Sequence, residues 1–173
     1  MPVITAIVVS YNSRSWLPAC LRALADSVPP VDVVVVDNDS TDGSADLVAE
    51  EFPQVRLLRL SANLGYSGGA NIGLEAAGTE LAVVMNPDVV IERDTLAAVT
   101  EAFRSDPRIA VVGGKLLYPD RATIQHAGAI LRPPHYLTTH RGYGQPDDGR
   151  WDEPADVDFV TGALLGIRRS AFV

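Results

Sequence analysis

Short apolar runs rich in Val, Ile and Leu alternate with helical patterns along most of the chain. The strand-type runs cover residues 3–10, 32–37, 55–60, 81–86 and 109–113, and the helical patterns cover 15–26, 44–52, 67–77 and 94–104. Apolar runs without clean polar alternation are typical of strands that are buried on both faces. The alternation predicts right-handed βαβ crossovers. We therefore expect an α/β fold with a mainly parallel, Rossmann-like sheet flanked by helices.

The chain changes character after about Lys115. Proline and glycine become frequent and helical periodicity fades, which predicts loops and hairpins laid over the sheet. An apolar segment at 157–167 follows, with Thr161-Gly162 in its middle, and another helix begins where the chain stops at Val173. We expect one domain with an α/β half, 1–114, and a loop-rich half, 115–173, that the end of the chain cuts short.

Composition limits the classes of function. The chain has 173 residues, 47% of them hydrophobic, which is enough for one ordinary core. It carries 14 Lys and Arg against 22 Asp and Glu, a net charge of -8, which disfavours nucleic acid held by phosphate contacts. An acidic protein that binds an anionic diphosphate needs a metal or a local cluster of donors.

Cysteine usage and hydropathy add two further limits. The single cysteine, Cys20, excludes an intramolecular disulfide and a cysteine-rich zinc site, and it lies on the apolar face of a predicted helix, which favours core packing. No apolar stretch reaches the roughly 20 residues of a transmembrane segment, while peripheral membrane contact stays open.

Polar residues follow the first predicted strand. In open α/β sheets, ligands bind outside the carboxyl ends of the strands. Strand one ends in Ser10-Tyr11-Asn12-Ser13, whose hydroxyl, ring and amide can surround a flat base. The alternative is that Ser13 or Ser15 caps the next helix while Tyr11 packs, and both can hold together.

The second strand ends in three carboxylates and an amide. Asp42-Gly43 is a turn pair, and Thr41 or Asp42 can cap the next helix. These structural roles do not explain Asp37. An acidic group beside the amide of Asn38 suits hydrogen bonds to the imide edge of a base or to a ribose hydroxyl.

The third strand leads into NLGYSGGANIG, residues 63–73. We expect a glycine-rich turn running into a helix, where a ligand can approach the backbone and an anion can meet unpaired N–H groups. The spacing is neither G-x-G-x-x-G nor that of a P-loop. Tight helix packing alone could explain Gly69 and Gly73.

The fourth strand ends at Asn86-Pro87-Asp88. Proline should end the strand and direct Asp88 out of the sheet edge. Taken alone, the tripeptide favours a structural turn. Together with the polar ends of the other strands it favours a carboxylate that ligates Mg²⁺ or Mn²⁺, since magnesium needs only one or two protein carboxylates.

Other site chemistries have less support. The three histidines, His126, His135 and His140, lack zinc-site spacing, and structural or surface roles are expected for them. The sequence has neither a G-x-S-x-G elbow nor a plausible cysteine nucleophile.

The order of these motifs resembles a known family. The segments are IVVSYNS (7–13), VVVDNDSTDGS (34–44), NLGYSGGANIG (63–73), MNPD (85–88) and FVTGALLGIRR (159–169). Together they resemble the inverting glycosyltransferases of family 2, which have the GT-A fold, and specifically the branch that contains rhamnosyltransferases.

The resemblance implies roles for individual residues. The base and ribose would be surrounded by Ser10, Tyr11, Asn12, Asp37 and Asn38, with Asp39 nearby. The sugar-nucleotide side would be lined by Asn63, Gly68 and Asn71, and the border between donor sugar and acceptor by Gly162 and Ala163. Asn86-Pro87-Asp88 resembles the D-x-D motif of the family, so Asp88 would bind the metal. Asn86 stands where that motif has its first Asp.

The resemblance also implies a reaction. A sugar, with rhamnose on a thymidine diphosphate carrier as the specific guess, would pass by one in-line displacement from a nucleoside diphosphate sugar to a hydroxyl of a saccharide or lipid-linked saccharide. The product would be a cell-envelope polysaccharide, and the protein would be cytoplasmic, at the inner face of the membrane. The catalytic base is expected in an acidic pair beyond Val173, so Asp156 and Asp158 are expected to be strand-flanking residues only.

Three alternatives remain. The first is a domain that binds the nucleotide sugar without catalysing transfer. The second is a sugar nucleotidyltransferase, which would need a basic glycine-rich loop where this chain has SYNSRSW. The third is a receiver domain centred on Asp37, which would need an acidic pair after strand one.

Overall fold

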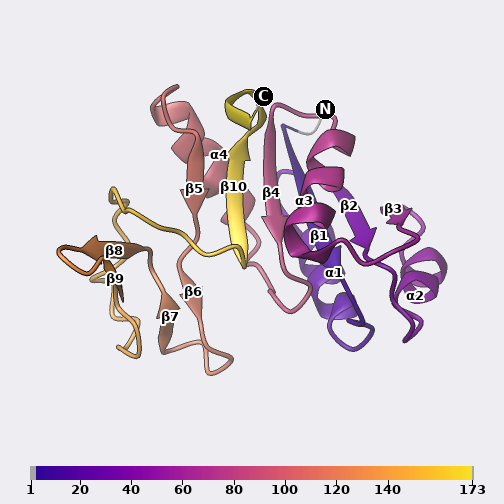
Figure 1. Ribbon diagram of the computed structural model, residues 1–173, viewed down its shortest axis with the longest axis horizontal. Helices are drawn as coiled ribbons and strands as arrows, with labels where there is room; N and C mark the ends of the chain where they lie inside the picture. The colour runs from indigo at the N-terminus through magenta and orange to yellow at the C-terminus, as the bar shows by residue number, and fades with distance from the viewer. Residues whose placement is uncertain (1–2, 173) are drawn as a thin grey trace.

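A computed structural model describes residues 3–172 and contains a six-stranded sheet with the order β3-β2-β1-β4-β10-β5 (Figure 1). The strands are β1 (Ile4–Ser10), β2 (Asp32–Asp37), β3 (Arg56–Arg59), β4 (Leu81–Met85), β5 (Val111–Gly113) and β10 (Leu164–Arg168). The first four pair in parallel, whereas β10 is antiparallel to both β4 and β5. The predicted mainly parallel sheet is confirmed, but β10 separates the fifth strand from the parallel group.

Helices cover both faces of the sheet. They are α1 (Leu17–Ala25), α2 (Ser44–Glu51), α3 (Gly65–Ala76) and α4 (Thr95–Ser105), and a 3₁₀ turn, η1 (Arg169–Phe172), follows β10. One buried cluster joins α1, α2 and α4 to β1 residues such as Val8. A second cluster joins α3 to β1 residues such as Ile7, because alternate side chains of a strand point to opposite faces. The α3 helix therefore lies on one face, and α1, α2 and α4 on the other.

Burial differs between the central and outer strands. Every residue of β1 and β4 is buried, as predicted, but β3 and β5 each expose part of their length. The prediction of burial on both faces is wrong for these two strands because they form the edges of the sheet.

The second half of the chain forms two hairpins, as predicted. They pair β6 (Leu116–Leu117) with β7 (Ile124–His126), and β8 (Ala129–Arg132) with β9 (Leu137–His140). The hairpins do not cover a face of the sheet. They lie beyond the carboxyl end of β5, since the chain passes almost directly from β5 into β6 (Figure 1). No helix within residues 3–172 has the length and apolar character needed to cross a bilayer.

Candidate functional site

The carboxyl ends of β1, β2 and β4 lie side by side. In the parallel registers, Ser10 of β1 is beside Asp37 of β2, and Val8 of β1 is beside Met85 of β4. The polar segments that follow these strands therefore share one edge of the sheet. This is the edge at which open α/β sheets bind ligands.

Ser10 and Asp37 bring two unsatisfied polar atoms to this edge. Both residues are buried, at 0% and 3% exposed, and Asp37 Oδ2 accepts a hydrogen bond of 3.1 Å from Ser40 N. Ser10 Oγ and Asp37 Oδ1 have no hydrogen-bond partner within residues 3–172. A buried polar atom without a partner costs about 1–3 kcal/mol, so a ligand that donates to these oxygens would gain free energy.

The loop after β1 is held against the loop after β2. Asn12 has a left-handed backbone with φ 48°; its N–H donates to Ser40 Oγ and its Oδ1 accepts from Thr41 N, both at 2.9 Å. Ser13 N likewise donates to Ser44 Oγ. The Tyr11 side chain, 50% exposed, is left free at the edge.

The predicted cap on α1 is absent from the structure. The N-cap residue of α1 is Trp16, and no side chain caps the helix. Ser13 Oγ donates instead to Tyr11 O at 3.0 Å, because its position before the helix favours a local turn bond.

The turn after β2 carries one exposed carboxylate and a second carboxylate that accepts backbone hydrogen bonds. Asp39, exposed and with φ 67°, lies at the edge. Asp42 Oδ1 accepts from Ser44 N at 2.9 Å at the start of α2, but the N-cap residue is Gly43 and no side chain caps the helix within residues 3–172, so the expected cap by Thr41 or Asp42 is not formed. Burial acts to raise the pKa of the Asp42 carboxyl, but hydrogen bonds from Ser44 and from the N–H of Arg14 outweigh it and lower that pKa.

Asn38 connects β2 to the start of α3. The residue is buried; its Oδ1 accepts from Leu64 N and its Nδ2 donates to Gly65 O, both at 2.9 Å. Both ends of the amide are therefore occupied by backbone. The role of Asn38 beside the nucleotide stays a prediction, and positioning the segment that carries Asn63 is the role its contacts support.

The glycine-rich segment runs into a helix, as predicted, but the helix begins at Gly65 and not at residue 67. The α3 helix begins at Gly65, whose φ is +72°, so Gly68 and Asn71 lie within the helix. A Cβ on Gly69 would lie 2.8 Å from Val9 Cγ1, and one on Gly73 would lie 2.2 Å from Ile7 Cγ2. Close packing on β1 therefore explains Gly69 and Gly73, as the packing alternative proposed.

The two exposed asparagines of this region can be reached by a ligand. Asn63 Oδ1 accepts from Gly65 N at 2.8 Å, which leaves its amide N–H₂ free, and Asn71 is exposed on α3. Both can still face a bound sugar nucleotide, as the sequence analysis expects.

The turn after β4 presents Asp88 at the surface. Val89 N donates to Asn86 O at 3.3 Å, so Asn86-Pro87-Asp88 is a turn, and the Asp88 side chain is exposed. Burial, and secondarily the charge of Asp88, raise the pKa of the Cys20 thiol to about 12. Because Asp88 follows β4, its carboxylate lies at the same edge of the sheet as Ser10 and Asp37.

A metal at this edge would have few protein ligands. Within residues 3–172, no three His, Cys, Asp or Glu side chains gather in a way that could hold a metal ion. The exposed carboxylate of Asp88 is the kind of ligand that magnesium and manganese take together with phosphate oxygens and water.

The segment before β10 joins this edge to α3 and β4. Asn86 N donates to Ala163 O at 3.1 Å, and the hydroxyl of Tyr66 donates to Gly162 O. Burial raises the pKa of Tyr66 to about 12, so this phenol is a hydrogen-bond donor at neutral pH. Gly162 and Ala163 lie beside the other predicted residues, whereas the contact of Tyr66 was not foreseen from its motif.

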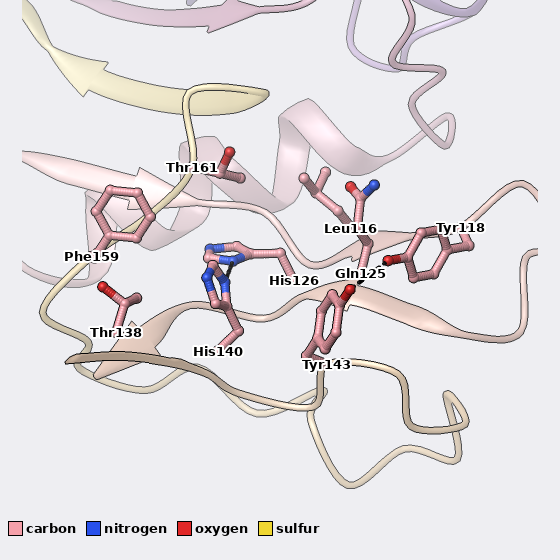
Figure 2. A pocket seen from close by; sticks show the side chains of 9 residues that line it. All are labelled: Leu116, Tyr118, Gln125, His126, Thr138, His140, Tyr143, Phe159 and Thr161. Atoms are coloured by element: carbon pink, nitrogen blue, oxygen red, sulfur yellow. Dashed lines mark hydrogen bonds between the residues drawn. The ribbon is translucent and has the colours of Figure 1, made fainter. Parts of the chain in front are cut away.

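A pocket of about 500 Å³ opens between the hairpins, next to Thr161 (Figure 2). Its lining residues are Leu116, Tyr118, Gln125, His126, Thr138, His140, Tyr143, Phe159 and Thr161. Figure 2 shows the imidazoles of His126 and His140 facing each other, with their Nδ1 atoms 2.9 Å apart. This pairing could not be predicted from the sequence, because it depends on how the two hairpins meet.

The pocket carries aromatic rings and one unsatisfied nitrogen. The Tyr118 and Tyr143 hydroxyls are 3.3 Å apart, and the Phe159 ring centroid lies 6.2 Å from that of His126. His126 is 3% exposed, and its Nε2 has no partner within residues 3–172. Burial, and then the neighbouring His140, lower the pKa of His126, so its imidazole is neutral at pH 7.

Comparison with known proteins identifies the family. The model of "Glycosyl transferase family 2" matches residues 5–172. The chain belongs to glycosyl transferase family 2. The family assignment agrees with the predicted resemblance and argues against the nucleotidyltransferase and receiver-domain alternatives.

Two curated relatives of this family 2 chain are named glycosyltransferases. An N-acetylglucosaminyl-diphospho-decaprenol L-rhamnosyltransferase of Mycobacterium tuberculosis is 30% identical, over 98% of this chain and 62% of that protein. An undecaprenyl-phosphate mannosyltransferase of Micrococcus luteus is 36% identical, over 75% of this chain and 58% of that protein. The family 2 chain thus spans less than two thirds of the length of either relative.

Solved structures show that the fold is GT-A. The mannosyltransferase PcManGT of Pyrobaculum calidifontis, in complex with GDP-Man and Mn²⁺, has a TM-score of 0.67 at 23% identity, over 98% of this chain and 45% of that one. TarS of S. aureus in complex with UDP-GlcNAc has a TM-score of 0.58 at 27% identity, over 68% and 35%.

Proposed function

We propose that this family 2 chain carries the donor-binding part of a glycosyltransferase that moves a sugar from a nucleoside diphosphate sugar to a hydroxyl acceptor. The observation that carries the proposal is the convergence of Ser10, Asp37 and Asp88 at one edge of the sheet. In this proposal residues 1–114 bind the donor and residues 115–173 begin the acceptor side.

The nucleoside would meet the ends of β1 and β2. The unpartnered oxygens of Ser10 and Asp37 would accept hydrogen bonds from the imide N–H of a base or from a ribose hydroxyl. The exposed ring of Tyr11 would stack on the base, with Asn12, Asn38 and Asp39 shaping the surrounding loops.

The diphosphate would lie between β4 and α3. Asp88 would hold Mg²⁺ or Mn²⁺, whose positive charge would stabilise the leaving diphosphate. The structural neighbour PcManGT was solved with GDP-Man and Mn²⁺, which supports a divalent cation in this fold. The N–H₂ of Asn63 and the exposed surface of α3 at Gly68 and Asn71 would face the donor.

The acceptor would enter from the hairpin side. The pocket beside Thr161 has aromatic and polar walls, which suit a saccharide ring, and Gly162 and Ala163 connect it to the Asp88 edge. The relative named N-acetylglucosaminyl-diphospho-decaprenol L-rhamnosyltransferase supports a lipid-linked saccharide as acceptor. Together with the undecaprenyl-phosphate mannosyltransferase it supports an acceptor that carries a polyprenyl lipid, and such an acceptor would place the reaction at a membrane, in this proposal at its inner face. The rhamnosyltransferase relative supports rhamnose as donor sugar and an envelope polysaccharide as product.

Transfer with inversion requires a base for the acceptor hydroxyl. Asp158 does not suit this role, because its Oδ2 accepts from Leu131 N at 2.9 Å beside β8, in agreement with its predicted strand-flanking place. Asp156 likewise receives no catalytic role in this proposal.

Calorimetry with UDP-GlcNAc, GDP-mannose and TDP-rhamnose, each with and without Mn²⁺, tests the proposal. We expect one of these donors to bind more tightly with Mn²⁺ and the free sugars not to bind. Failure of all three donors to bind in the presence of Mn²⁺ would contradict the proposed function.

A transfer assay then distinguishes an enzyme from a binding domain. The bound donor is incubated with a lipid-linked saccharide, using this chain and a version extended to the length of the mycobacterial relative. Transfer by the longer chain alone would indicate that residues 1–173 bind the donor without catalysing, and equal transfer by both would exclude the binding-only alternative.

A further inference from the structure

The β8–β9 hairpin protrudes from the molecule with apolar residues at its tip. All residues from 131 to 140 are exposed, and Leu131, Tyr136 and Leu137 are 38%, 68% and 68% exposed. Figure 1 shows this hairpin at the end of the molecule farthest from β3. A two-stranded hairpin is only marginally stable on its own in water. Apolar side chains that are exposed together at its tip indicate a surface that contacts a partner.

The base of the hairpin is fixed to the rest of the protein. Ala129 is fully buried and bridges to Phe159, and Asp158 Oδ2 accepts from Leu131 N. The tip is therefore an extension supported by a rigid base. This arrangement suits insertion into a surface better than closure over a ligand.

The hairpin segment has a charge opposite to that of the whole chain. The sequence has no Asp or Glu between Asp120 and Asp147, while the same stretch carries Arg121, Arg132 and Arg141. The whole chain has a net charge of -8. A local basic segment in an acidic protein fits an anionic partner.

One of these arginines is free at the tip. Arg121 pairs with Glu92, and Arg141 lies over the Trp151 ring at 5.3 Å. Arg132, the cross-strand partner of Leu137, forms no ion pair within residues 3–172. The Asp158 carboxylate of the packed segment accepts instead from the N–H of Leu131, the residue before Arg132.

We propose that the tip of the β8–β9 hairpin, residues 131–137, docks on an anionic membrane surface. Tyrosine and leucine side chains partition into the interface between headgroups and acyl chains, and a neighbouring arginine keeps its charge at the level of the lipid phosphates. A second copy of the chain fits less well, since pairing of two tips would bring two basic segments without Asp or Glu together.

Docking of the tip would orient the pocket toward the bilayer. Thr138 and His140 of β9 line the pocket, so its wall continues directly into the docking tip (Figure 2). The headgroup of a lipid-linked saccharide would then meet the pocket at the membrane surface. This consequence rests on the proposed function, whereas the docking itself does not.

Co-sedimentation with vesicles tests the docking, with no nucleotide sugar present. The vesicles consist of phosphatidylcholine alone or of phosphatidylcholine mixed with phosphatidylglycerol. We expect the chain to sediment with the anionic vesicles and to be released by high salt. The double variant Tyr136→Ser, Leu137→Ser should bind about tenfold more weakly, and Arg132→Ser about fivefold more weakly.

Phe172→Ser is the matched control. Phe172 is 60% exposed but follows β10, at the opposite end of the sheet from the hairpins (Figure 1). This variant should bind vesicles as the unchanged chain does, and thermal unfolding should show that the hairpin variants remain folded.

Several results would overturn the docking proposal. They are the absence of sedimentation with anionic vesicles, equal binding by the double variant, and a dimer that depends on Tyr136 and Leu137 without vesicle binding. Because the assay contains no donor, a failure here leaves the proposed glycosyl transfer to be judged by calorimetry alone.

Discussion

Asp37 is the residue whose environment most clearly separates binding from folding. One carboxylate oxygen accepts from Ser40 N, while the other is buried without a partner among residues 3–172, next to Ser10 on the neighbouring strand. The hydrogen bond from Ser40 N gives the first oxygen a structural role, but it does not explain why the second oxygen is buried. The second is an acceptor held ready at the carboxyl edge of the sheet, where a nucleoside would donate to it.

Asp37→Asn should separate the two roles of this side chain. The amide can still accept from Ser40 N, but its N–H₂ cannot accept from a base or ribose. We expect nucleotide sugar binding to weaken about tenfold, the equivalent of one lost hydrogen bond to a charged group. Thermal unfolding should change little, and unchanged affinity in calorimetry would show that this oxygen does not face the ligand.

Cys20 gives a second prediction at the scale of one residue. The thiol is 0% exposed, and burial followed by the charge of Asp88 raises its pKa to about 12. Ellman's reagent at pH 8 should therefore not label the native chain and should label it once in guanidinium chloride. Because folding raises the pKa of this thiol, its contribution to the free energy of unfolding is fully present below the ordinary thiol pKa. That contribution falls as the pH rises toward 12. Rapid native labelling would contradict the burial of this side chain.

Residue roles were only partly predictable from the sequence. Ser10 and Asp37 could be located because apolar runs end at them. The occupation of both ends of the Asn38 amide could not be predicted, since its partners, Leu64 and Gly65, lie on another element. The pairing of His126 with His140 could not be predicted either, because the two residues lie on different hairpins.

At the scale of elements, the packing of α3 shapes the candidate site. The sequence predicted a helix over 67–77 although glycine disfavours helix when only local propensity is considered. Packing compensates for this cost, because Gly69 and Gly73 let α3 lie directly on Val9 and Ile7 of β1. The exposed side of the helix start is thereby held beside the end of β4.

Gly73→Ala tests this packing. The added Cβ would lie 2.2 Å from Ile7 Cγ2, so the overlap should exceed the gain in helix propensity and destabilise the protein by about 1–3 kcal/mol. Gly78→Ala is the control, because a Cβ there meets nothing within 4 Å and its backbone is not left-handed. Equal unfolding midpoints for the two variants in urea would show that α3 does not pack as closely as described.

The position of β10 marks the limit of prediction at this scale. Residues 157–167 form an apolar segment with no indication of which strands it joins. Its insertion between β4 and β5, antiparallel to both, depends on the whole path of the second half. Sequence pattern predicts that such a segment is buried, but it does not predict its neighbours.

At the scale of the whole molecule, the two halves meet at the functional edge. Tyr66 of α3 donates to Gly162 O, and Asn86 N donates to Ala163 O, so the segment before β10 is hydrogen-bonded both to α3 and to the turn after β4. The order of motifs along the chain predicted this fold and edge. The hairpins and their pocket, which lie beyond β5, emerge only in three dimensions (Figure 1).

The central claim is that Asp88 holds a divalent cation that in turn holds the donor diphosphate. Calorimetry of Asp88→Asn with the donor that the unchanged chain binds, with and without Mn²⁺, tests it most directly, and Asp156→Asn is the control. We predict that Asp88→Asn loses the Mn²⁺-dependent part of donor binding, while Asp156→Asn keeps it. Mn²⁺-dependent binding that is unchanged in Asp88→Asn would contradict the claim.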